Sequence, residues 1–162
     1  MPTLKVLFRL GDPHNLVDEA IMKVCGGMEV HAEALISDNP FTCFSAHLHT
    51  GVRETTKLEG SIAQWYCLDT GVIIKDSSLL WAKEECGQPY ALLSAILSGF
   101  EDKAIKAQHA DLHPLFCSMA VTGFAKANGL YLGFNRPNPL LLARRLKDMP
   151  STPCEVPREL FV

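Results

Sequence analysis

Residues 30–47, VHAEALISDNPFTCFSAH, are the stretch that decides the fold class. Two apolar-rich runs of strand length, 30–37 and 41–47, flank the turn sequence Asp-Asn-Pro at 38–40. Strands joined by so short a connection pair antiparallel. The stretch therefore predicts a β-hairpin.

The residues around this hairpin extend the same pattern. We expect further strands over residues 4–10, 51–53 and 62–68, and a short helix over 16–24. The second half predicts helices over residues 77–86, 90–97, 115–128 and 138–147. Strands followed by separate helices indicate an α+β fold. We expect one domain over residues 1–148 and an extended C-terminal arm over 149–162.

The composition narrows the function classes. The chain has 162 residues, 48% of them hydrophobic, which is typical of one globular domain. Its net charge of −3 argues against a general nucleic-acid binder. No run approaches the ~20 apolar residues of a membrane span, and the N-terminal run resembles a strand more than a secretory leader. The sequence therefore predicts a cytoplasmic protein, or a virion-associated or host-cytoplasmic one if its source is viral.

The six cysteines are not arranged in metal or redox motifs. They lie at positions 25, 43, 67, 86, 117 and 154, and no two of them form a CxxC pair. Without a secretory leader, reduced thiols are expected rather than a disulfide framework.

Cys117 stands out among these cysteines by its position. It lies at the start of the helix predicted over 115–128, where unpaired N–H groups and the helix dipole favour a thiolate. The same N–H groups can stabilise an oxyanion during acyl transfer. Cys117 is therefore the candidate nucleophile. The alternative interpretation is a buried structural cysteine.

His31 is the candidate base that a cysteine nucleophile requires. It shares one strand face with Glu33, two residues later. Ser45, His47 and His49 form a second in-phase set on the next strand. Glu33 or one of these three could orient the His31 imidazole. The alternative is that His31 lies on an exposed polar edge.

Two functions of other classes also fit the sequence. His109, His113 and Cys117 are spaced four residues apart, as metal ligands on one helix are. Pro114 argues against a continuous helix there. The other possibility is a catalytically silent binding or virion-structural module. No cofactor is otherwise expected.

Several short segments occur in a familiar order. They are His31-Ala-Glu-Ala-Leu-Ile-Ser, Phe44-Ser-Ala, Gly87-Gln-Pro-Tyr-Ala, and Cys117-Ser-Met-Ala-Val. Together they resemble the circularly permuted papain-like cysteine hydrolases, the permuted branch of the NlpC-type superfamily, including its small phage-encoded members. Two residues depart from that pattern. The family often has Glu at the position of Met119, and His or Glu at the position of Ser45.

The resemblance implies a fold and an activity. The fold would be a small antiparallel, barrel-like sheet packed against helices. The activity would be that of a cysteine peptidase or amidase, in which Cys117 and His31, with Glu33, Ser45 or His47 as the third residue, transfer an acyl group through a thioester. The implied substrates are a peptide, an isopeptide or a lipid ester.

Overall fold

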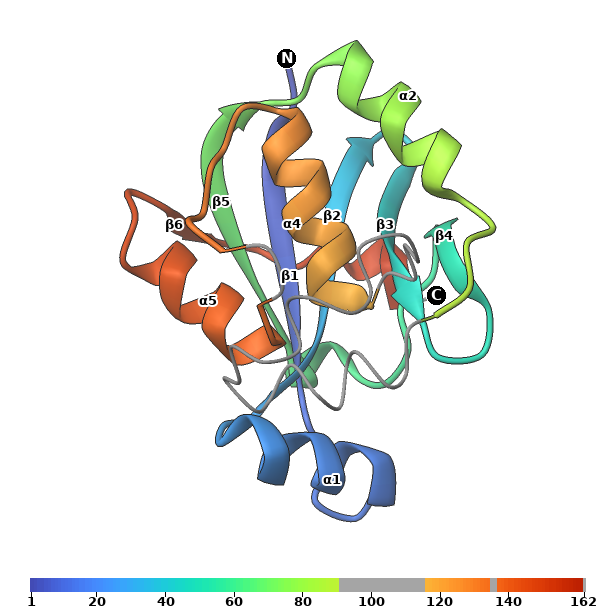
Figure 1. The fold of residues 1–162 in the computed structure, drawn as a ribbon, viewed down its shortest axis with the longest axis vertical. Coiled ribbons are helices and arrows are strands. Elements are labelled where there is room, and N and C mark those ends of the chain that lie inside the picture. The colour runs from blue at the N-terminus through green and yellow to red at the C-terminus, as the bar shows by residue number, and fades with distance from the viewer. Residues whose placement is uncertain (91–115, 135–136, 162) are drawn as a thin grey trace, which may run out of the picture.

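The computed structural model describes residues 1–90, 116–134 and 137–161. It contains one sheet with the strand order β4-β3-β2-β1-β5-β6 (Figure 1). The strands are β1 Thr3–Leu10, β2 Glu29–Asp38, β3 Phe41–His47, β4 Gly51–Thr55, β5 Trp65–Ile73 and β6 Thr152–Cys154. The helices are α1 Leu16–Cys25, α2 Asp76–Glu85, α4 Cys117–Ala127 and α5 Pro139–Lys147. The helix predicted over 90–97 falls almost entirely outside the described residues.

The predicted α+β class is confirmed, but the predicted barrel-like closure is wrong. All described strand pairs are antiparallel, and the sheet is open, with β4 at one edge and β6 at the other. A barrel requires its two edge strands to pair. Here β6 comes from the C-terminal segment and pairs with β5, so it extends the sheet away from β4.

The hairpin predicted over residues 30–47 is confirmed. β2 and β3 pair from Asp38↔Phe41 to Ala34↔Phe44. Alternation along β2 directs Ala32, Ala34 and Ile36 into the main core. The residues between them, including Glu33, face the other side of the sheet. This alternation places the candidate site residues.

The main core lies between the sheet and the helices α2, α4 and α5. α4 packs across β2 and β3, while α1 lies beyond one end of the sheet and α2 towards the other (Figure 1). The largest fully buried side chains of the main core include Phe8, Phe44, Phe124, Leu142 and Leu146. Each such side chain contributes roughly 1.5–3 kcal/mol by leaving water. None of the described helices is long and apolar enough to cross a bilayer.

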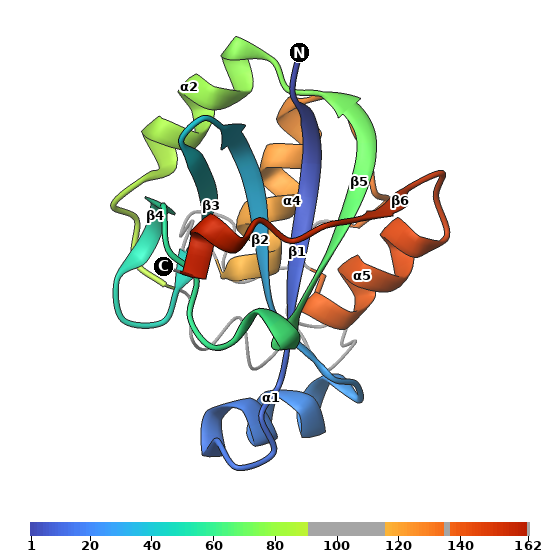
Figure 2. The ribbon, with the colours of Figure 1, turned by 180° about the vertical axis from the view of Figure 1, so that it is seen from behind.

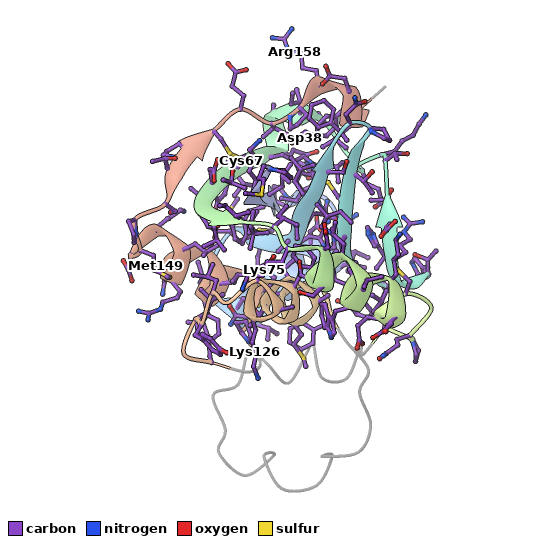
Figure 3. All side chains as sticks on the ribbon, turned by 90° about the horizontal axis from the view of Figure 1, so that it is seen from above. Asp38, Cys67, Lys75, Lys126, Met149 and Arg158 are labelled. Carbon is purple, nitrogen blue, oxygen red and sulfur yellow. A yellow bond between two sulfur atoms is a disulfide. The ribbon has the colours of Figure 1, made fainter. Side chains whose placement is uncertain are left out.

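The C-terminal segment covers the opposite face of the sheet (Figure 2). Seen from above, α2 and α4 lie on one side of the sheet and the segment carrying Arg158 lies on the other (Figure 3). Leu160 is fully buried in a second core with Leu7, Leu35 and Trp65. The residues expected as an arm thus contribute to the packing of the sheet.

A disulfide joins Cys67 to Cys154, so the expectation of reduced thiols throughout is wrong. The two cysteines are register partners on β5 and β6, with Cα atoms 5.2 Å apart (Figure 3). They are separated by 87 residues in the sequence. No local spacing shows that these two strands lie side by side.

Removing this disulfide is expected to destabilise the fold. A cross-link over so long a loop restricts the unfolded chain, and its loss typically costs about 2–5 kcal/mol. Cys154→Ser should lower the urea midpoint under non-reducing conditions. Cys86→Ser is the matched control, since Cys86 is free and exposed. Equal midpoints for Cys154→Ser and wild type would contradict this prediction.

Candidate functional site

The candidate site lies where β2 and β3 separate. Their backbone pairing ends at Ala34↔Phe44, although β2 continues to pair with β1 as far as Glu29. In this opening the Ser45 hydroxyl donates to the carbonyl oxygen of Ala32 at 2.6 Å. Ser45 thus connects the two strands and does not hydrogen-bond the His31 ring.

Glu33 is the centre of a buried polar cluster. Its side chain is fully buried, and its Oε1 atom lies 2.9 Å from His31 Nε2 and 3.0 Å from His47 Nε2. The His31 contact is a hydrogen bond, whereas the His47 contact lacks hydrogen-bond geometry. Glu33 Oε2 and His47 Nε2 are both buried without a hydrogen-bond partner among the described residues. Two imidazoles thus flank one carboxylate.

The environment keeps Glu33 ionised. Burial alone would raise the pKa of this carboxyl group. The contacts from His31 and His47, together with their positive charges when protonated, outweigh burial and lower the pKa to about 2. A buried carboxylate therefore faces both rings at neutral pH.

Cys117 begins α4, and together with His31 it lines the same cavity. Phe116 at the N-cap has no side chain that can accept from the first N–H groups of the helix, and no other described side chain caps this end. Burial alone would lower the pKa of His31. The negative charge and hydrogen bond of a Cys117 thiolate, followed by those of Glu33, raise that pKa to about 10. A protonated His31 is therefore stabilised between sulfur and carboxylate.

The first turn of α4 is held in place by its neighbours. Phe116, which precedes the helix, is 1% exposed, and Cys117 is 3% exposed. The buried Ser118 hydroxyl donates to the carbonyl oxygen of Pro137, just before α5. Phe124 packs against Phe44 on β3. The position of the sulfur relative to β2 therefore depends on well-packed elements.

A cavity of about 670 Å³ opens onto these groups, and Cys117, His31, Glu33 and His47 all line it. α1 forms one wall with an apolar face made of Leu16, Val17, Ala20, Ile21 and Val24.

An ion pair anchors this wall to the sheet. Asp18, the only buried residue of α1, accepts two hydrogen bonds from Arg9 on β1, at 3.0 and 2.8 Å. α1 therefore buries its aspartate and leaves Leu16 82% and Val17 50% exposed. The apolar face remains available for contact with a bound molecule.

Two other free cysteines lack an activating environment. Cys25 lines the same cavity, but burial and then the charge of Cys117 raise its pKa to about 11. Burial and then the charge of Glu33 raise the pKa of Cys43 further still. Both are therefore expected to remain thiols.

The other predicted site residues either line the cavity away from the Glu33 cluster or lie outside the described residues. His49 is exposed in the turn after β3, although it lines the cavity. His109 and His113, which were predicted to bind a metal together with Cys117, lie outside the described residues. Arg53 on β4 was not anticipated from the sequence, and its Nε atom is buried without a described partner beside the same cavity. Nothing in its sequence context distinguishes it.

The structure also shows a group that could hold a metal ion. His31, Glu33 and His47 each offer a donor atom, and these atoms lie within 4.8 Å of one another. The sequence contained a usable signal, because residues 31 and 33 are in phase on one strand of a hairpin and 45 and 47 on the other. The same signal also fits a catalytic histidine with an orienting partner, so the sequence alone does not choose between the two.

Comparisons with known proteins identify one similar structure. Neither the protein-family models nor the curated proteins give a match. Among solved structures, the chain is similar to metalloprotein yiiX from Escherichia coli O157:H7, described as DUF1105, with a TM-score of 0.55 and 18% identity. The match covers 98% of this chain and 90% of that one. At this identity it shows a shared fold alone.

This finding overturns the predicted family. The similar structure is described as a DUF1105 metalloprotein, not as a papain-like cysteine hydrolase of the NlpC type. The assignment as a permuted papain-like thiol protease is therefore wrong. It rested on short motifs of common residues, each of which occurs by chance in unrelated chains.

Proposed function

We propose that the protein is a cysteine-dependent hydrolase or acyltransferase that forms a thioester on Cys117. The observation that carries this proposal is that Cys117, at the start of α4, lines the same cavity as His31, whose ring contacts Glu33. A nucleophile, a base and a group that orients the base are the parts that such chemistry requires.

The reaction follows from these positions. His31 takes the proton of Cys117, and the thiolate attacks the carbonyl carbon of an ester or amide, forming the C–S bond. N–H groups at the start of α4 stabilise the oxyanion. Collapse breaks the bond to the leaving group, which takes the proton from His31. Water or another acceptor, deprotonated by His31, then attacks the thioester and releases the acyl group and the thiol.

Glu33 is the better candidate for the orienting residue. Its Oε1 accepts the Nε2 hydrogen of His31, which leaves Nδ1 for the sulfur. Ser45 donates instead to a backbone carbonyl oxygen. In this assignment Glu33 fixes the tautomer and stabilises the imidazolium that forms.

The cavity favours a substrate with an apolar acyl portion. Among peptide, isopeptide and lipid-ester substrates, the apolar wall of α1 supports an ester or amide of an apolar acid.

Trapping of the acyl-enzyme tests the proposal. The protein is mixed with p-nitrophenyl acetate or octanoate, quenched in acid, and its mass and modified residue are determined. We expect one acyl group on Cys117, lost in Cys117→Ala and retained in the matched control Cys25→Ala. An adduct that persists in Cys117→Ala, or none in wild type, would contradict the proposal. An unreactive Cys117 would support the silent binding module instead.

Metal binding is the second candidate function. Two imidazoles and one carboxylate form a ligand set that binds zinc in proteins. His47 Nε2, which is buried without a hydrogen-bond partner among the described residues, fits such an ion. The description of the similar structure as a metalloprotein also favours it. Metal analysis of the purified protein, with His47→Ala as comparison, tests this candidate.

A further inference from the structure

We propose that a zinc-like divalent cation held by His31, Glu33 and His47 switches off the chemistry of Cys117, because the ion and the reaction require the same imidazole. The inhibition rests on the proposed function of Cys117. The binding of the ion does not.

The geometry of the three donors is close to that of a bound ion. Glu33 Oε1 lies 2.9 Å from His31 Nε2 and 3.0 Å from His47 Nε2. Bonds of about 2.1 Å to a tetrahedral zinc ion place its donor atoms about 3.4 Å apart. The two donor pairs that include Glu33 therefore need to separate by only about 0.4–0.5 Å to admit the ion, and all three donor atoms lie within 4.8 Å of one another.

The polar atoms of the cluster are incompletely satisfied without an ion. Glu33 Oε2 and His47 Nε2 are buried and lack hydrogen-bond partners among the described residues. An unsatisfied buried polar group costs about 1–3 kcal/mol. A cation held by Glu33 Oε1 and the two rings would give His47 Nε2 a partner, and two nitrogen donors favour zinc over calcium or magnesium.

Occupancy of this site removes the base. A neutral imidazole carries one N–H and one lone pair. An ion on His31 Nε2 uses the lone pair and keeps the hydrogen on Nδ1, the nitrogen that does not contact Glu33. His31 can then neither take the proton of the thiol nor form the imidazolium that protonates the leaving group. It also loses its hydrogen bond to Glu33.

Binding is tested by calorimetric titration of chelator-treated protein with zinc chloride. We expect one ion per chain, with affinity at least about 10-fold weaker in His47→Ala and His47→Gln, as for lost supporting groups at metal sites. His49→Ala is the matched control, because His49 lines the same cavity outside the donor group. Cys117→Ser should bind zinc as wild type does. Absence of binding, or its loss in Cys117→Ser, would overturn the site.

Inhibition is tested by the rate at which iodoacetamide labels Cys117. Zinc should slow labelling about 10-fold or more in wild type, in keeping with loss of a positioned base, and EDTA should restore it. The ratio of the rates with and without zinc should fall to near one in His47→Ala. If zinc binds but does not slow the labelling, the proposal that the ion inhibits Cys117 is overturned.

The two failures are distinguishable. If Cys117 is slow to label even in EDTA, the proposed function fails while the titration still reports on the ion. If Cys117 labels rapidly in EDTA and zinc does not bind, only this inference fails.

Discussion

Replacing His31 with alanine is expected to slow acylation of Cys117 by about 10²–10⁴-fold, the range that positioned acid–base groups contribute. In the proposed mechanism the variant lacks the group that accepts the sulfur proton, and it also loses the hydrogen bond between His31 and Glu33. The measurement is the release of p-nitrophenol from an activated ester in EDTA.

The matched control for this variant is His49→Ala. This substitution removes an exposed imidazole from the same cavity but leaves Cys117 and His31 in place. The variant should therefore keep the wild-type rate within about a factor of three. Equal rates for His31→Ala and wild type, with both proteins folded, would show that His31 is not the base.

Replacing Glu33 with glutamine is expected to destabilise the protein in a pH-dependent way. The folded-state pKa of Glu33 is lowered from 4.5 to about 2. Its ionised form therefore contributes stability that is present above about pH 4.5 and is lost as the pH falls towards 2. Such a shift in a fully buried group corresponds to about 3 kcal/mol.

Urea unfolding of both proteins in EDTA at several pH values measures this effect. The difference in unfolding free energy should be largest near pH 6 and shrink steadily below pH 4. Glu29→Gln is a useful comparison, because Glu29 also lies on β2 but contacts Tyr66 and Lys147. A difference for Glu33→Gln that is constant with pH would contradict the assigned ionisation.

Local pattern predicted most of the elements. The hairpin, α1 and α5 follow from alternation, helical spacing and caps such as Asn15 and Asn138. The strand expected over 62–68 begins instead with a 3-10 turn at Ile62–Gln64, and β5 starts at Trp65. That turn carries a capping box between Ser61 and Gln64, which competes locally with extended structure.

Long-range pairing was not predictable in the same way. The Cys67–Cys154 disulfide and the open sheet edge both depend on β6 pairing with β5. The three residues of β6 include Pro153, a residue that disfavours strand structure in local patterns.

The site was partly predictable. Alternation placed His31 and Glu33 on one face, and the helix start singled out Cys117. The separation of β2 from β3 could not be inferred, so the bond from Ser45 to the carbonyl oxygen of Ala32 was missed. Resemblance in short motifs then suggested a family that the structural comparison does not support.

The most direct test of the central claim is competitive labelling of the free cysteines with iodoacetamide at pH 7 in EDTA, quantified by mass spectrometry. The account predicts that Cys117 labels well ahead of Cys25 and Cys43, although Cys117 is as buried as the core, and that His31→Ala removes this advantage. Labelling of Cys117 no faster than Cys25, and unchanged by His31→Ala, would contradict a reactive Cys117–His31 pair.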